Sequence, residues 1–179
     1  IGGLGFPILH EMGRALLRLL RGQRLGLFSL HARLALGTTG VLLLGGAVAI
    51  LLREGEGALA GLPWGSRILA SAFQSVTART AGFNTLEIGA LLPATLLVLM
   101  ALMFIGGCPG STAGGIKTTT AAAMAATLWA TVRGREQVEA FRRTIPAEQV
   151  AKALALVGIS LGSVALAILA LLAGQPGEP

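Results

Sequence analysis

A glycine-rich segment at residues 106–117 interrupts an apolar run that extends from residue 88 to residue 132. The segment contains five glycines, Pro109 and the charged residue Lys117. Hydrocarbon cannot hydrogen-bond the backbone groups that such a break sets free, so at membrane depth it persists only when buried in protein or lining a watery cavity. The types and spacing of these residues therefore indicate a pore or a substrate site.

A second candidate site follows a short apolar stretch at residues 68–78. This stretch is too short to cross a membrane and fits a re-entrant half-helix. It ends at residues 79–85, where Ala81 and Gly82 would allow a close approach of the backbone and unusual dihedral angles. The partially negative end of the half-helix would then face a cation whose hydration shell is replaced by backbone carbonyls. The alternative is an ordinary interfacial loop.

Composition places the chain in the lipid bilayer, because 54% of its 179 residues are hydrophobic and only 12% are charged. Its 14 Lys and Arg exceed its 8 acidic residues, but they flank apolar runs and form no basic-aromatic face for stacking bases. This argues against nucleic acid. The chain has no Asp and no Ser/His or carboxylate pair at apolar depth, so an enzyme is not expected. A near-match to a nucleotide-binding loop fails because Ile116 separates the last glycine from the lysine.

Charge-free runs predict the elements that position these sites. Residues 34–52 and 153–174 are each long enough for a span, and residues 88–132 form a span broken at 106–117. Basic segments flank the first span, the half-helix and the broken span. The positive-inside rule then puts both segments in the cytoplasm and the half-helix on the outer side. We expect an all-α, multi-pass membrane protein.

Two motifs carry a resemblance to a known family. Residues 73–85, FQSVTARTAGFNT, resemble the pore helix and filter of the third repeat in the Trk/Ktr/HKT family of potassium transporters. Residues 106–120, GGCPGSTAGGIKTTT, are similar to the intramembrane loop of that repeat, and residues 1–7 resemble the end of the second repeat. Subunits of the family contain four span, pore-loop, span repeats around one pathway. With one filter turn, this chain looks like a piece of a longer protein and should not conduct alone.

The resemblance implies a division of the chain into four parts. These are the end of the second repeat with a basic cytoplasmic loop, the third repeat, a cytoplasmic connection, and the first span of the fourth repeat, at residues 1–33, 34–132, 133–152 and 153–179. By the same resemblance, one quarter of a selectivity filter comes from Thr80, Ala81, Gly82 and Phe83. The gate below it would be formed by residues 106–117, namely Gly106, Gly107, Pro109, Gly110, Ser111, Thr112, Gly114, Gly115 and Lys117.

Two charged residues near these sites each allow two interpretations. Arg79 either supports the filter by pairing with Glu87 or Glu54, or lies in water at the outer face. Lys117 either places a positive charge at the gate that competes with or repels a cation, or extends to the cytoplasmic edge of the membrane. The break itself is either a moving gate or a static kink.

The function implied by the resemblance is potassium uptake across the cell membrane, with ions moving passively through carbonyl sites. It also implies a homodimer, a soluble nucleotide-binding regulatory subunit on the cytoplasmic side, and no cofactor other than the transported K⁺ or Na⁺. Two alternatives stay open. One is a sodium or sodium/potassium secondary transporter with broken helices, and the other is a non-conducting structural subunit whose small residues serve helix packing.

Overall fold

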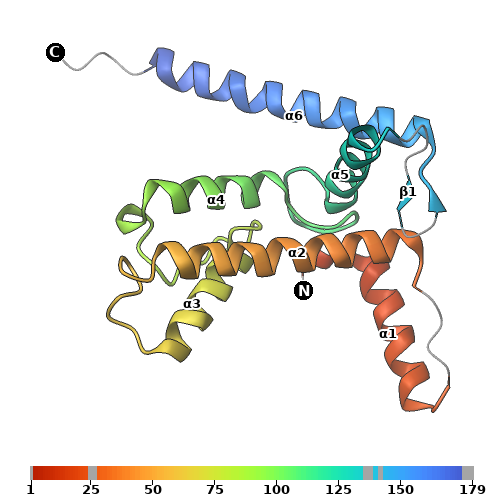
Figure 1. Ribbon diagram of the computed structural model, residues 1–179, viewed down its shortest axis with the longest axis horizontal. Helices are drawn as coiled ribbons and strands as arrows, with labels where there is room; N and C mark the ends of the chain where they lie inside the picture. The colour runs from red at the N-terminus through yellow and green to blue at the C-terminus, as the bar shows by residue number, and fades with distance from the viewer. Residues whose placement is uncertain (1, 24–27, 135–138, 141–142, 175–179) are drawn as a thin grey trace. The chain divides into compact units, whose positions relative to one another are not determined.

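The computed structural model describes residues 2–23, 28–134, 139–140 and 143–174. Parts of the expected cytoplasmic segments 1–33 and 133–152, and the tail after residue 174, lie outside the described residues. The predicted all-α fold is confirmed, since the regular elements of the described residues are helices apart from two paired strands of two residues each. In chain order the elements are η1 (Gly2–Leu4), α1 (Phe6–Leu20), α2 (Leu30–Arg53), α3 (Trp64–Thr77), η2 (Ile88–Ala90), α4 (Pro93–Phe104), α5 (Thr118–Val132), β1 (Glu139–Ala140), β2 (Arg143–Thr144) and α6 (Ala147–Gly174) (Figure 1).

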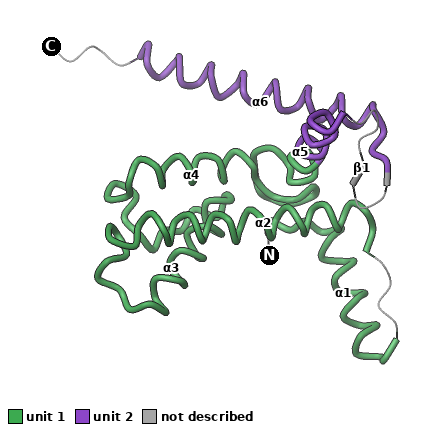
Figure 2. Tube along the Cα trace, viewed as in Figure 1, with its two compact units in different colours: residues 1–122 green, residues 123–179 purple. Residues whose placement is uncertain are grey.

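The chain forms two compact units, residues 1–122 and residues 123–179, which Figure 2 draws in different colours. The first unit contains the elements from η1 to α4 and the start of α5. The second contains the remainder of α5, the two short strands and α6. Both candidate sites lie in the first unit.

Helix length separates the elements that can cross a bilayer from those that cannot. α2 and α6 have 24 and 28 residues and are apolar enough to span. At 1.5 Å per residue they reach about 36 Å and 42 Å, against a hydrocarbon core of about 30 Å. α3 and α4, with 14 and 12 residues, reach only about 21 Å and 18 Å. α3 can therefore enter the membrane without crossing it.

α2 packs against both α3 and α4, and a glycine makes this contact possible. A Cβ on Gly46 would lie 2.5 Å from the Ser75 hydroxyl and 2.7 Å from a methyl carbon of Leu102. The Ser75 hydroxyl donates a hydrogen bond of 2.8 Å to the carbonyl of Leu43. α3 is thus held against the middle of α2. An apolar core surrounds this contact and includes Ile50, Leu59, Ala78, Leu86, Leu91, Leu99 and Leu102.

A buried carboxylate joins the end of α2 to the start of α4. Glu54 directly follows α2 and is fully buried. It accepts hydrogen bonds from the Thr95 hydroxyl and from the backbone N–H groups of Leu92, at 2.9 Å, and Ala58, at 3.2 Å. Burial opposes the charge, but the three hydrogen bonds outweigh it and hold the pKa of Glu54 below its ordinary value. Glu54 therefore fixes the position of α4, from which the glycine-rich break emerges.

Candidate functional site

Residues 79–85, which we call the filter turn, leave the C-terminal end of α3. Their backbone is unusual, because Thr80 has a φ of 66° and Gly82 a φ of 79°. A β-branched residue rarely adopts such a φ, so the surroundings must hold Thr80 there. The Thr77 hydroxyl closes the turn by accepting from the N–H of Phe83 at 2.9 Å and donating to the Phe83 carbonyl. The four residues from Thr80 to Phe83 are exposed in this chain.

Residues 106–117, which we call the glycine loop, separate α4 from α5. A bridge between Ile105 and Ile116 brings the two ends of the loop together, with the N–H of Ile116 donating to the Phe104 carbonyl at 2.9 Å. The two arms touch so closely that a Cβ on Gly106 would lie 1.6 Å from the carbonyl oxygen of Gly114. Glycine is required at this position by the close approach of the two arms.

The glycine loop is also bound to the start of the chain. The N–H of Cys108 donates to the Gly3 carbonyl at 2.8 Å, and the N–H of Phe6 donates to the Gly110 carbonyl at 3.3 Å. Gly5 has a φ of 76°, and a Cβ there would lie 2.3 Å from the Pro109 carbonyl oxygen. The segment that precedes α1 therefore forms a support against which the loop rests.

Cys108 belongs to the glycine loop and contacts this support. Its side chain is fully buried and belongs to a small apolar cluster with Ile8 and Ala35. The hydroxyls of Thr39 and Thr118 each lie 3.4 Å from its sulfur. This environment fits a packing role better than a redox role.

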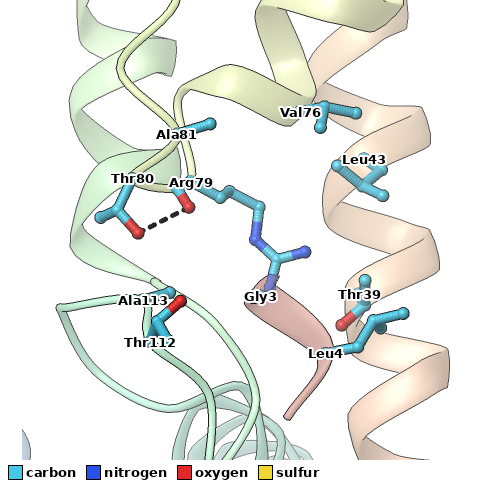
Figure 3. Close-up of a pocket in the computed structure, with 10 residues that line it drawn as sticks. All are labelled: Gly3, Leu4, Thr39, Leu43, Val76, Arg79, Thr80, Ala81, Thr112 and Ala113. Atoms are coloured by element: carbon cyan, nitrogen blue, oxygen red, sulfur yellow. Dashed lines mark hydrogen bonds between the residues drawn. The ribbon is translucent and has the colours of Figure 1, made fainter. Parts of the chain in front are cut away.

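A cavity of about 320 Å³ is lined by residues of both the filter turn and the glycine loop. Several water molecules would fit in this volume. Figure 3 shows Arg79 between the loop residues Thr112 and Ala113 and the α2 residues Thr39 and Leu43. The lining is completed by Gly3, Leu4, Val76, Thr80 and Ala81. Residues from the predicted filter and the predicted gate thus line one cavity.

The partner of Arg79 differs from the two carboxylates expected from the sequence. Its Nε and Nη2 atoms both donate to the carbonyl oxygen of Gly106, at 3.2 Å and 2.7 Å. The predicted pairing with Glu54 or Glu87 is not found, and the carboxylate of Glu54 is bound by α4 and the loop after α2. Arg79 is buried, so the alternative of a residue in open water at the outer face is also not found.

Lys117 turns back onto the loop to which it belongs. Its Nζ donates to the carbonyl oxygen of Ala113 at 2.7 Å, and its side chain is half-buried. This contact holds the last turn of the loop before α5. The positive charge therefore lies at a backbone carbonyl of the glycine loop.

Two residues of the site are not among those predicted from the sequence. Thr39 lies within an uncharged span, although a hydroxyl in such a run is itself a sign of a polar neighbour. Thr77 precedes the filter turn, and local hydroxyl bonds of this kind offer the backbone an alternative to continued helix. Among the described residues, no group of three or more His, Cys, Asp and Glu side chains is placed to hold a metal ion.

Fold and site together define a class: an all-α membrane protein in which the turn after a short helix and a glycine-rich break between two apolar helices line one cavity. The family model described as "TrkH: Cation transport protein" matches residues 1–175. The chain belongs to this TrkH family of cation transport proteins. The family relationship predicted from the two sequence motifs is confirmed.

Curated relatives are consistent with this membership. The chain is 37% identical over 171 residues to the potassium/sodium uptake protein NtpJ of Enterococcus hirae, covering 95% of the chain and 36% of that protein. It is 39% identical over 174 residues to the Ktr system potassium uptake protein B of Bacillus subtilis, covering 95% of the chain and 37% of that protein. The chain thus spans little more than a third of the length of these relatives.

Proposed function

We propose that this chain forms one quarter of a potassium pathway within a full-length uptake protein of the cell membrane. The observation that carries the proposal is the shared cavity, which is lined by Thr80 and Ala81 of the filter turn and by Thr112 and Ala113 of the glycine loop. An ion that leaves the turn on this side would meet the loop next. The names of the relatives, which describe potassium and potassium/sodium uptake, support the choice of cargo.

In this proposal the backbone carbonyls from Thr80 to Phe83 replace part of the hydration shell of K⁺. The positive φ of Thr80 supports this role, because a non-glycine residue in this strained conformation is retained mainly where function requires it, whereas Gly82 adopts its positive φ without strain. The exposure of the same residues supports it as well, since the remaining three quarters of the filter would cover them.

The glycine loop acts as the gate in this proposal. It packs with both arms in contact, beside the cavity that the ion must enter. The ammonium group of Lys117 donates a hydrogen bond to the carbonyl oxygen of Ala113, so a cation near the loop must compete with Lys117 for this oxygen. Opening requires the loop to move away from its contacts with Gly3 and Gly5.

The assembly that we propose is a homodimer with a soluble nucleotide-binding regulatory subunit bound at the cytoplasmic face. Support comes from the description of several relatives as parts of a Ktr system. The exposed arginines of α1, Arg14 and Arg18, provide a basic surface at the face where such a subunit would bind. Purification of the full-length protein with and without the candidate regulator, followed by mass determination, tests both statements.

The filter assignment is tested by Gly82→Ser in the full-length protein, reconstituted in liposomes with K⁺ and Na⁺ fluxes measured separately. Serine at a φ of 79° is strained by about 1–2 kcal/mol, so the turn should distort and the K⁺/Na⁺ flux ratio should fall about tenfold. Gly89→Ser is the matched control, because Gly89 lacks a positive φ and a Cβ there would meet no atom within 4 Å. An unchanged ratio in Gly82→Ser would remove this turn from the filter.

The gate assignment is tested by Lys117→Gln and by deletion of residues 110–115. Both should raise K⁺ flux at equal protein density, because each removes part of the barrier. No gain in flux from either variant would contradict a gate at this position. Flux that strictly requires an opposing or accompanying Na⁺ gradient would instead support the secondary transporter.

A further inference from the structure

Arg79 joins the two halves of the candidate site across 27 residues of sequence. Its guanidinium donates twice to one acceptor, the Gly106 carbonyl oxygen, at 3.2 Å and 2.7 Å. The residue is only 9% exposed. Hydrogen bonds from a charged donor in such a buried place are among the stronger ones in proteins.

The acceptor lies at a position that must change if the glycine loop moves. Gly106 is the first residue of the loop, and its backbone lies against Gly114 on the opposite arm. The carbonyl that accepts from Arg79 therefore belongs to a residue at which the two arms touch. A separation of the arms would be expected to move this acceptor relative to Arg79.

The donor lies next to the most unusual residue of the filter turn. Thr80, with a φ of 66°, directly follows Arg79, and its hydroxyl donates to the Arg79 carbonyl at 2.7 Å. A strained conformation of this kind lasts only while neighbouring contacts hold it. The bond from Arg79 to the loop fixes the residue immediately before the strained one.

We propose that Arg79 is a positioning residue that couples the glycine loop to the filter turn, so that the state of the gate alters the selectivity of the filter. This inference rests on the proposed function. Coupling of two sites is reciprocal, so a change in the turn also alters the stability of the closed loop. Arg79 couples the two segments through its hydrogen bonds to Gly106 and does not itself bind the ion.

The test is a double-mutant cycle in the full-length protein, with the K⁺/Na⁺ flux ratio as the readout. Arg79→Lys keeps the charge but loses the planar pair of donors. The flux ratio should fall about tenfold, which corresponds to the lower end of the free energy that a hydrogen bond to a charged group contributes. Lys117→Gln should also lower the ratio when Arg79 is present. In the double variant Lys117→Gln should change total flux but lower the ratio no further.

Arg67→Lys is the matched control, because Arg67 also donates to backbone carbonyls, those of Gly55, Ala60 and Leu62. These contacts lie in the loop between α2 and α3 and at the start of α3, away from the glycine loop. The control should leave the flux ratio unchanged. An equal fall in the ratio from Arg67→Lys would overturn the specific link.

Two outcomes separate failure of the link from failure of the proposed function. If the effects of Arg79→Lys and Lys117→Gln on the ratio multiply while Gly82→Ser still lowers it, the link is refuted and the filter assignment stands. If Gly82→Ser has no effect on the ratio, the proposed function fails first. Should Arg79→Lys not assemble, Arg79→Gln, which retains an N–H donor, enters the same cycle with the same expected result and criterion for rejection.

Discussion

Replacing Gly106 by alanine should force the two arms of the glycine loop apart. A Cβ at this position would lie 1.6 Å from the Gly114 carbonyl oxygen, whereas real Cβ contacts are essentially never shorter than 3.0 Å. One arm must therefore shift by roughly 1.4 Å. The shift would weaken the hydrogen bond between Ile116 and Phe104 that closes the loop.

The magnitude follows from these two effects. Overpacking costs about 1–3 kcal/mol, and the weakened hydrogen bond adds about 0.5–1.5 kcal/mol. The packed loop should therefore lose about 1.5–4.5 kcal/mol relative to an open one. Since about 1.4 kcal/mol corresponds to a factor of ten, the open population should rise by about tenfold to a thousandfold, until the loop is always open.

The assay is K⁺ flux into liposomes that contain equal amounts of full-length wild-type protein and Gly106→Ala. Gly106→Ala should give a large gain in flux, whereas Gly89→Ala, whose added Cβ meets no atom within 4 Å, should behave like the wild type. Size-exclusion chromatography in detergent establishes that each variant is assembled. Wild-type or reduced flux from an assembled Gly106→Ala protein would show that the packed loop is not the barrier.

Further predictions concern Cys108 and Glu54. The first is tested in a full-length protein whose other cysteines are replaced. Cys108 should resist a membrane-permeant maleimide because it is fully buried, and it should react at least tenfold faster in Gly106→Ala. Equal reaction rates in the two proteins would contradict opening of the loop. Glu54→Gln should lower the melting temperature, because it removes the charged acceptor of three hydrogen bonds and so lowers the free energy of unfolding by about 1–3 kcal/mol. Because the pKa of Glu54 is lower in the folded protein, its ionised form stabilises the fold at every pH above the ordinary glutamate pKa. This stabilisation is lost as the pH falls through the lower pKa of the folded state. Melting temperatures measured from neutral to acidic pH should therefore converge for wild type and Glu54→Gln, and a constant difference would contradict this role.

The elements that depend on local sequence are accessible without a structure. Long uncharged runs predict α2 and α6, because the bilayer requires about twenty apolar residues. The break before α5 is visible because five glycines and a proline gather within twelve residues, whereas the isolated or paired glycines of α2 leave that helix intact. Membership of the family can be predicted as well, because each of the two motifs that indicate it is continuous in sequence.

The ends of the helices are less accessible, because charged residues are a poor guide to helix boundaries. α3 begins at Trp64, before the expected start at residue 68, since Arg67 turns back to bond carbonyls of the preceding loop. α6 likewise begins at Ala147, before the uncharged run, where Glu148 and Lys152 form an ion pair one helical turn apart. In both helices a charged side chain is bound by a neighbouring group, so the helix can begin before the uncharged run.

The partners of buried polar groups are not accessible from the sequence. The sequence predicts a carboxylate partner for Arg79, but its acceptor is a backbone carbonyl that reaches it only because the glycine loop folds back. Glu54 lies in a charge-balanced stretch typical of an exposed loop, yet it is buried against α4. Such contacts depend on which segments meet in space, and no local pattern of residue types records that.

The most direct test of the central claim is the position of the ion itself. Full-length protein prepared in Rb⁺, a heavy substitute for K⁺, should show anomalous scattering beside the backbone carbonyls of Thr80 to Phe83, on the path to the cavity that the glycine loop lines. Anomalous density that avoids these carbonyls and lies at another site in the protein would contradict the account.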